Sequence, residues 1–192
     1  MAEDDTVPDD ADLCAVADVQ AYLNLSSNQD NALLQTLITN ASAFIDNYCN
    51  RTLLSNVYTE TRNGTGGESM SVRQFPVTAI TSLTIDGQTI NPATSFHTPG
   101  FVWDEDMIYL RGGLRFCRGA QNVTFTYTAG MSSVPADINQ ACVEIVALKY
   151  KRRLSIEVSS KTLNGEVISF NNTDMPASAK STLANYKRVF LG

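Results

Sequence analysis

The sequence is poor in the residues that most often carry chemistry. Its 192 residues include one histidine, His97, and one tryptophan. A single histidine supports neither a histidine-based metal cluster nor a Ser-His-Asp triad with a choice of partners. Because His97 lies in a stretch rich in Gly, Pro and Thr, residues 92–100, it is expected to be a solvated loop side chain. We therefore predict no catalytic residues and no enzymatic activity.

Cysteine is also scarce and widely spaced. Cys14, Cys49, Cys117 and Cys142 never form a C-x-x-C pair, which argues against a zinc site and against a redox motif. We expect reduced thiols that pack like small apolar side chains. The sequence therefore predicts no metal and no cofactor.

Long apolar runs are missing too. No run approaches the roughly 20 residues that cross a bilayer. The N-terminus, Met1-Ala-Glu-Asp-Asp5, is acidic where a secretory signal is basic and then apolar. These patterns predict a protein that is neither secreted nor inserted in a membrane.

Two short motifs resemble binding sites but lack their defining residues. Gly64-Thr-Gly-Gly67 has no following Lys-Ser/Thr, so it predicts a flexible turn rather than a phosphate loop. Asp104-Glu-Asp106 lacks the spaced oxygen ligands of a calcium loop and predicts a solvated tip between strands.

Charge is distributed unevenly along the chain. Residues 1–148 hold 17 acidic and 6 basic side chains, a balance of −11, whereas residues 149–192 hold 3 and 8, a balance of +5. A basic end can bind nucleic acid, dock on an acidic protein or only aid solubility.

Apolar residues at helical spacing predict helices near 16–23, 28–49, 135–153 and 176–190. Between them, short β-rich stretches are separated by turns, and Asp86-Gly87 is a hairpin signal. The predicted fold class is therefore α+β, a helical core with an inserted small antiparallel β-subdomain. The predicted helical core consists of Leu34, Leu37, Ile38, Ala41, Ile45, Ile138, Ala141, Cys142 and Ile145.

The same patterns predict a domain organisation. Residues 1–12 form an acidic flexible tail, residues 13–52 and 129–153 the helical core, and residues 53–128 the β insertion. Residues 154–175 form an extended arm that contains a possible hairpin around Asn164-Gly165, and residues 176–192 form a C-terminal docking helix.

The order of motifs resembles the head-to-tail adaptor, or connector, proteins of tailed bacteriophages and gene transfer agents, in the variant with a β insertion. The resemblance spans about residues 13–190, and its most specific part is the junction Tyr127-Thr-Ala-Gly130 to Val134-Pro-Ala-Asp-Ile138 with the helix that follows. The other motifs are Gln20-Ala-Tyr-Leu23, Leu33-Leu-Gln-Thr-Leu-Ile38, Phe75-Pro-Val77, Leu83-Thr-Ile-Asp-Gly87 and Lys149-Tyr-Lys-Arg-Arg153. The insertion at residues 53–128 departs from the shortest, almost entirely helical members.

This resemblance implies a structural virion protein in the neck, assembled in the host cytoplasm, that forms a dodecameric ring under the portal and joins capsid to tail. The implied partners are further copies of the chain, the portal, a stopper, tail-terminator or other neck protein, and genomic DNA that passes through without sequence-specific binding. By analogy with the family, the basic C-terminal helix is expected to dock on the portal. The predicted portal-binding residues are Lys180, Leu183, Tyr186, Lys187, Arg188, Val189, Phe190 and Leu191.

Two alternatives remain open at this stage. The basic C-terminal segment could bind nucleic acid, although the sequence pI of 4.7 is low for such a protein. The β insertion could be a ligand-binding module, with Trp103 and Tyr109 as stacking groups, although single aromatic residues in strands are mostly core.

Overall fold

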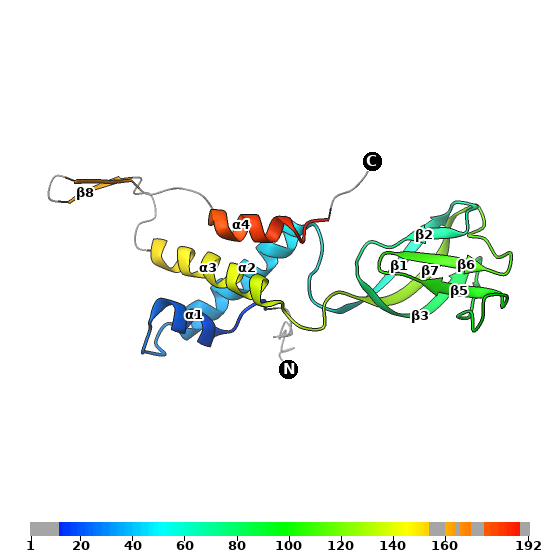
Figure 1. Cartoon of the computed structure of the whole chain (residues 1–192), viewed down its shortest axis with the longest axis horizontal. Helices are drawn as coiled ribbons and strands as arrows, with labels where there is room; N and C mark the ends of the chain where they lie inside the picture. The colour runs from blue at the N-terminus through cyan, green and yellow to red at the C-terminus, as the bar shows by residue number, and fades with distance from the viewer. Residues whose placement is uncertain (1–11, 154–159, 164–165, 170–174, 189–192) are drawn as a thin grey trace, which may run out of the picture. The chain divides into compact units, whose positions relative to one another are not determined.

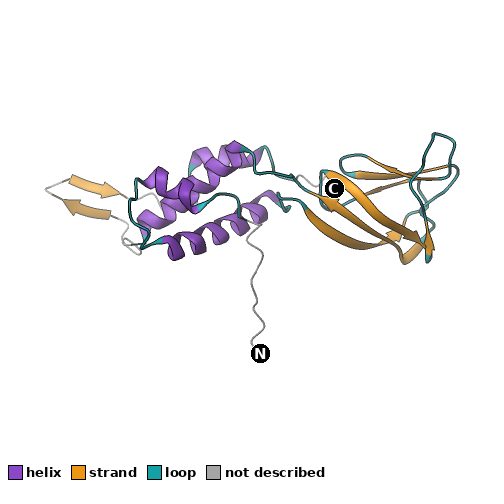
Figure 2. Cartoon of the chain, turned by 90° about the horizontal axis from the view of Figure 1, so that it is seen from below, coloured by secondary structure: helices purple, strands orange, loops and turns teal. Residues whose placement is uncertain are grey.

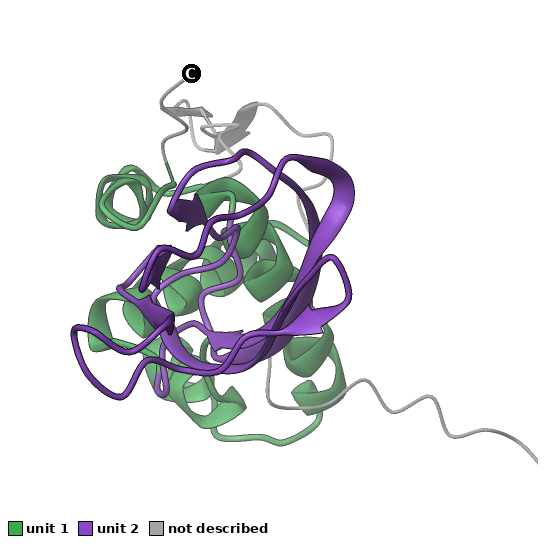
Figure 3. Ribbon diagram, turned by 90° about the vertical axis from the view of Figure 1, so that its right-hand side faces the viewer, with its two compact units in different colours: residues 1–50, 134–192 green, residues 51–133 purple. Residues whose placement is uncertain are grey.

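The computed structural model describes residues 12–153, 160–163, 166–169 and 175–188. The chain divides into two compact units (Figure 3). One unit contains residues 1–50 and 134–192, and the other contains residues 51–133. Nearly all of the predicted acidic tail and most of the predicted arm lie outside the described residues.

Four helices build the first unit: α1 (Val16–Leu23), α2 (Asn31–Cys49), α3 (Ala136–Arg152) and α4 (Ala177–Ala184) (Figure 1). Helices α2 and α3 are antiparallel neighbours. Asp30, just before α2, accepts a hydrogen bond from the Tyr150 hydroxyl near the end of α3. Near the middle of both helices, the Ser42 hydroxyl oxygen lies 3.9 Å from the Cys142 Sγ. The helices match their predicted positions, with two differences in their bounds.

The first difference is the start of α2. Residues 28–30 form a turn in which the Asn31 N–H donates to the Asn28 carbonyl, so the helix begins at Asn31 rather than at residue 28.

The second difference is the end of α4, which the sequence placed at residue 190. The helix ends at Ala184, and the chain then turns back toward α2, where the Arg188 N–H donates to the Cys49 carbonyl at 2.8 Å. Carbonyl groups at a helix end lack partners within their own helix. The bond from Arg188 therefore caps α2, and it requires the chain to leave the helical path.

Buried apolar side chains hold the helical unit together. Of the nine predicted core residues, Leu37 is half-buried and the other eight are buried. Leu13, Val19, Ala179 and Leu183 are buried with them. Each fully buried aliphatic side chain contributes roughly 1.5–3 kcal/mol.

The second unit is made of strands (Figure 2). Its elements are β1 (Asn56–Gly64), β2 (Ser69–Ser71), β3 (Val77–Ile85), β4 (Gln88–Thr89), β5 (Gly100–Trp103), β6 (Met107–Arg111) and β7 (Gly119–Ala129). They form a four-stranded sheet in the order β1-β7-β3-β4 and a three-stranded sheet in the order β2-β6-β5. All of their pairings are antiparallel, which confirms the α+β class.

The predicted hairpin at Asp86-Gly87 is confirmed and joins β3 to β4. Asp86 and Gly87 both have positive φ, 51° and 78°. Positive φ at both central residues is what a two-residue turn requires in order to follow the twist of paired strands, and Gly adopts it without steric cost.

The core of the β unit combines aromatic packing with one buried polar contact. Phe101, Phe116, Phe125 and Tyr127 are almost completely buried. The Tyr127 hydroxyl donates to the buried carboxylate of Glu60 and accepts the Gln74 N–H at 3.0 Å. Burial, with the adjacent Glu60, raises the pKa of Tyr127, so the hydroxyl keeps the proton that it donates.

A separate hairpin belongs to the segment between α3 and α4. Strand β8 (Ser160–Leu163) pairs in antiparallel fashion with β9 (Glu166–Ser169), at the position that the sequence predicted. The predicted turn, Asn164-Gly165, lies outside the described residues. None of the helices described in the chain has the length and apolar character needed to cross a membrane.

Candidate functional site

The side chains that most often carry catalysis or bind metal do not gather into one site within the described residues. His97 is exposed, and the edge of its ring faces Phe96 with the two ring centroids 5.3 Å apart. Within the described ranges, no three histidine, cysteine, aspartate or glutamate side chains lie close enough to hold a metal ion.

The two motifs that resembled binding sites lie in turns. The Gly64 N–H donates to the Asn122 side chain at 2.8 Å, and a Cβ at Gly64 would lie only 1.7 Å from the Cys117 carbonyl oxygen. Glycine at this position is therefore explained by close backbone packing. Asp104, Glu105 and Asp106 are exposed between β5 and β6.

Three of the four cysteines are buried, as small apolar residues would be, but Cys117 is exposed. It lies in the turn before β7, where its carbonyl oxygen accepts a hydrogen bond from the Asn122 amide. The backbone of this residue, rather than its thiol, has the structural role.

Helix α4 is the predicted docking element, and one face of it is packed against its own unit. Ala179 and Leu183 are buried, and the Ser178 hydroxyl donates to Glu144 on α3. Just beyond the helix, the Tyr186 hydroxyl donates to Asp137 at 2.7 Å, and this hydrogen bond raises the pKa of Tyr186.

The segment before α4 is rich in polar residues and offers few apolar anchors, but apolar and polar contacts fix α4 itself to the helical unit. Leu183 is fully buried, so it is not available on the surface for a partner to contact.

The opposite face of α4 remains accessible. Lys180 and Lys187 are exposed, and the Lys187 ammonium lies 5.0 Å from the centre of the Tyr48 ring. Arg188 is half-buried. Val189, Phe190 and Leu191, the apolar part of the predicted portal-binding set, lie outside the described residues.

At the basic end of α3, cations contact their own subunit. Arg153 forms an ion pair with Asp30 at 3.3 Å, and the Lys149 ammonium lies 5.2 Å from the centre of the Phe44 ring. The hydrogen bond from Tyr150, with help from Arg153, lowers the pKa of Asp30. Two basic residues at the end of α3 thus help to hold α3 against α2.

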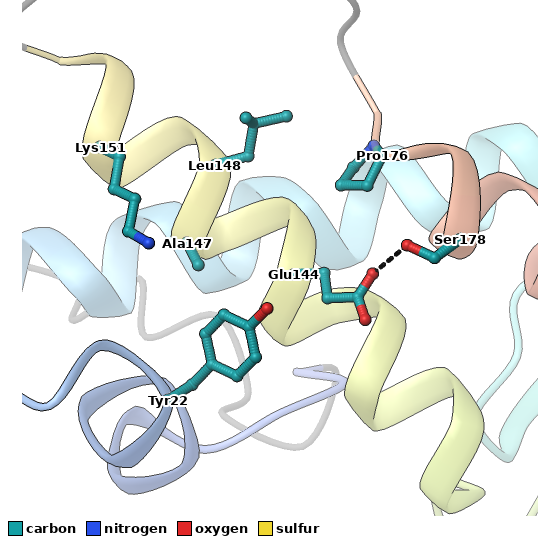
Figure 4. Close-up of a pocket in the computed structure, with 7 residues that line it drawn as sticks. All are labelled: Tyr22, Glu144, Ala147, Leu148, Lys151, Pro176 and Ser178. Carbon is teal, nitrogen blue, oxygen red and sulfur yellow. Dashed lines mark hydrogen bonds between the residues drawn. The ribbon is translucent and has the colours of Figure 1, made fainter.

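An open groove of about 330 Å³ lies between α1, α3 and the start of α4 (Figure 4). Tyr22 projects into it from α1 and is 51% exposed. Its lining consists of Tyr22, Glu144, Ala147, Leu148, Lys151, Pro176 and Ser178. Sequence reasoning missed this groove because its residues come from three separate segments, and only helix packing brings them together.

The β unit presents aromatic side chains of its own. Phe96 is 74% exposed, whereas Trp103 and Tyr109 are 39% and 38% exposed. The Trp103 ring packs beside the buried Phe101, with ring centroids 6.1 Å apart. This contact supports an edge-of-core role for Trp103.

The four packed helices and the antiparallel β unit define an α+β protein. Residues 12–189 match the model of the head completion protein family, and the chain belongs to that family. This membership confirms the resemblance to head-to-tail adaptors: the protein is a structural component of the virion at the junction of head and tail.

Solved structures share the fold. A chain in the "Neck of empty GTA particle computed with C6 symmetry" is 20% identical, with a TM-score of 0.61, and the match covers 94% of this chain and 93% of that chain. A chain in the "Neck of native GTA particle computed with C12 symmetry" is 18% identical, with a TM-score of 0.59 and coverage of 92% and 91%. A chain in the "Virion of native gene transfer agent (GTA) particle" is 20% identical, with a TM-score of 0.60 and coverage of 94% and 93%. No curated protein matches the chain.

Proposed function

We propose that the protein assembles into a ring in the neck of a phage-like particle, under the portal, where it joins capsid to tail and continues the DNA channel. The observation that carries this proposal is the family match over residues 12–189. The fold shared with chains of gene transfer agent necks, over more than nine-tenths of both chains, supports it.

A dodecamer is the proposed stoichiometry. The two neck structures that share the fold were described with C6 and C12 symmetry, and a ring of twelve copies contains both operations. In such a ring each subunit contacts its neighbours through two different surfaces, and the rotation closes the ring. The subunit therefore needs two complementary surfaces.

The groove beside Tyr22 is one candidate for such a surface. Tyr22 and Leu33 are 51% and 39% exposed on the helical unit, and covering side chains of this size by a neighbour favours association. Glu144 and Lys151 give the groove one charge of each sign. This arrangement suits a neighbouring copy with a polar, mixed-charge surface.

The charge distribution fits a conduit for DNA. Each phosphate that a Lys or Arg neutralises adds to affinity for DNA, and strong affinity would slow passage. Residues 1–148 carry 17 acidic and 6 basic side chains. An acidic ring of this composition would let DNA pass without holding it.

The proposed contact with the portal uses the accessible side of the C-terminal segment. It comprises Lys180, Tyr186, Lys187 and Arg188, together with the sequence Val189-Phe-Leu191 that follows. Charge reversal at Lys180 and Lys187 should weaken co-sedimentation with portal, while reversal at Arg118, which is exposed in the β unit, should not. Equal loss in both variants would contradict this assignment.

Neither alternative function gains support. A nucleic-acid-binding role would use residues 149–153 and the C-terminal basic side chains, and within that set Lys149 and Arg153 are half-buried and contact their own subunit. A ligand-binding role for the β unit would use Trp103, whose ring packs on Phe101. We propose that the protein has no enzymatic activity and acts through its surfaces.

Negative-stain imaging of the purified protein, with and without portal, tests the proposal. A ring, or a ring that caps the portal, is the expected result. A monomer that stays free of portal at micromolar concentration would contradict it. A salt-dependent shift of short duplex DNA by the purified chain would favour the nucleic-acid alternative instead.

A further inference from the structure

Two cysteines that are far apart in the sequence meet inside the helical unit. Cys14 precedes α1 and Cys142 lies in the middle of α3, and their Sγ atoms are 3.3 Å apart. Both side chains are buried, and the Cys14 thiol donates a hydrogen bond to the Cys142 sulfur. A separation of 128 positions hides this pair from any spacing motif.

We propose that Cys14 and Cys142 form an oxidation site, at which a peroxide converts the two thiols to a disulfide that fastens the segment before α1 to α3. The site goes beyond the adaptor function, because no step of ring assembly requires it. Only its setting, a particle released from the reducing cytosol, rests on the proposed function.

The pair is already held close to bonding distance. A disulfide places its sulfur atoms about 2.05 Å apart, so the Sγ atoms need to approach by roughly 1.2 Å. The Leu13 N–H donates to the Ser42 hydroxyl at 2.9 Å, which fixes the backbone beside Cys14 against α2. The same hydroxyl lies 3.9 Å from the Cys142 sulfur. Both sides of the pair are therefore held beside the same Ser42 hydroxyl.

The environment gives the two thiols different roles. The hydrogen bond from Cys14, with help from Ser42, lowers the pKa of Cys142, whereas the same bond, together with burial, raises the pKa of Cys14. Of the two thiols, Cys142 is therefore the easier one to deprotonate. A thiolate next to a protonated thiol is the pairing that redox-sensitive cysteines use.

An open groove reaches the Cys14 side of the pair, and the Cys142 sulfur lies 3.3 Å from the Cys14 sulfur. The volume of this groove is about 480 Å³, and Cys14 lines it together with Asp12, Asp18, Gln35 and Asn139. Hydrogen peroxide is small and uncharged, so it can enter between these polar side chains without an electrostatic penalty from the two carboxylates. A bulky disulfide reagent would be hindered.

The chemistry is balanced in two steps. The Cys142 thiolate attacks one peroxide oxygen, the O–O bond breaks, and a sulfenic acid and hydroxide form. The Cys14 sulfur then attacks the sulfenic sulfur, the S–S bond forms, and the oxygen leaves as water with the Cys14 proton. Peroxide gains two electrons, and the two sulfur atoms lose one each.

The other two cysteines provide internal controls. The buried Cys49 Sγ points to the Leu183 carbonyl oxygen at 3.8 Å, and Cys117 is exposed in the β unit. Cys117 is exposed, so its own oxidation would complicate the measurement. Replacing it by Ser also prevents cross-links between molecules.

The test treats the full-length Cys117→Ser protein with hydrogen peroxide, alkylates the remaining thiols and maps its peptides by mass spectrometry. The expected product is a peptide pair joined through Cys14 and Cys142, two hydrogens lighter than its reduced parts, that dithiothreitol separates. Because the bond closes a loop of more than 100 residues, the melting temperature should rise on the order of 10 °C and fall back after reduction.

Matched variants complete the design. Cys14→Ser in the same background should show neither the joined peptides nor the rise in melting temperature, and Cys49→Ser should show both. Two alkylated thiols at Cys14 and Cys142 after treatment, or a sulfinic acid at either, would overturn the proposal. A disulfide between Cys14 and Cys142 that forms without a rise in melting temperature would show that it does not fasten the segment before α1 to α3. All of these readouts use the isolated subunit, so they are independent of ring assembly.

Discussion

Replacing Ile145 by Asp should unfold the helical unit and leave the β unit folded. Ile145 is fully buried on α3. Removing a buried aliphatic side chain of this size costs about 2–5 kcal/mol, and an unpaired carboxylate in its place adds several more. The total approaches the roughly 5–15 kcal/mol that separates folded from unfolded states in a typical domain. Ile145→Val should cost only about 0.5–1.5 kcal/mol and lower the melting temperature by a few degrees.

Circular dichroism at the helical minimum follows the helical unit, and the fluorescence of Trp103, the single tryptophan, follows the β unit. Ile145→Asp should lose most of the helical signal, while the Trp103 emission maximum stays at its native wavelength. Asn40→Asp is the control, because it places the same charge on an exposed position of α2. A variant Ile145→Asp that melts like the parent would refute the assigned core.

Three further outcomes are expected. Tyr127→Phe leaves the buried Glu60 carboxylate without one donor and should lower the free energy of unfolding by about 1–3 kcal/mol, measured by urea titration with Trp103 fluorescence. Asp30 has a pKa below its ordinary 3.8 because Tyr150 donates to it, so its contribution to stability is present above pH 3.8 and is lost as the pH falls through the lowered pKa. The melting temperature of Asp30→Asn should therefore depend less on pH than that of the parent below pH 3.8. His97→Ala should leave folding and ring assembly unchanged in negative-stain images.

Periodicity predicted the helices well because their buried faces are dictated by local spacing. In α2 and α3, apolar residues three and four positions apart fall on one side of a helix, and the helices bury that side. The turn between β3 and β4 was equally readable, because Asp86-Gly87 can adopt positive φ at both positions. Each of these features depends only on residues that are close together in the sequence.

Features that depend on distant contacts could not be predicted in the same way. Helix α4 stops at Ala184 because Arg188 has to reach the Cys49 carbonyl, which no local pattern announces. The burial of Leu183 follows from the packing of α4 within the helical unit, which no local pattern of the sequence reveals. The Tyr22 groove and the Cys14 contact also form between segments separated by more than 100 positions.

The first and last residues of the β unit are far apart in the sequence but lie side by side in space. The Ser55 N–H donates to the Met131 carbonyl, and the Met131 N–H donates to the Leu53 carbonyl, at 2.9 and 2.8 Å. The β unit is thus inserted in the sequence between α2 and α3. During synthesis on a ribosome, α2 emerges long before α3, the helix that covers its apolar face. At about 5–20 residues per second, residues 51–133 take roughly 4–17 s to be made. For that interval the apolar face of α2 has to be shielded by a chaperone or by transient contacts, and a nascent chain stalled before residue 134 should be the form most prone to aggregate.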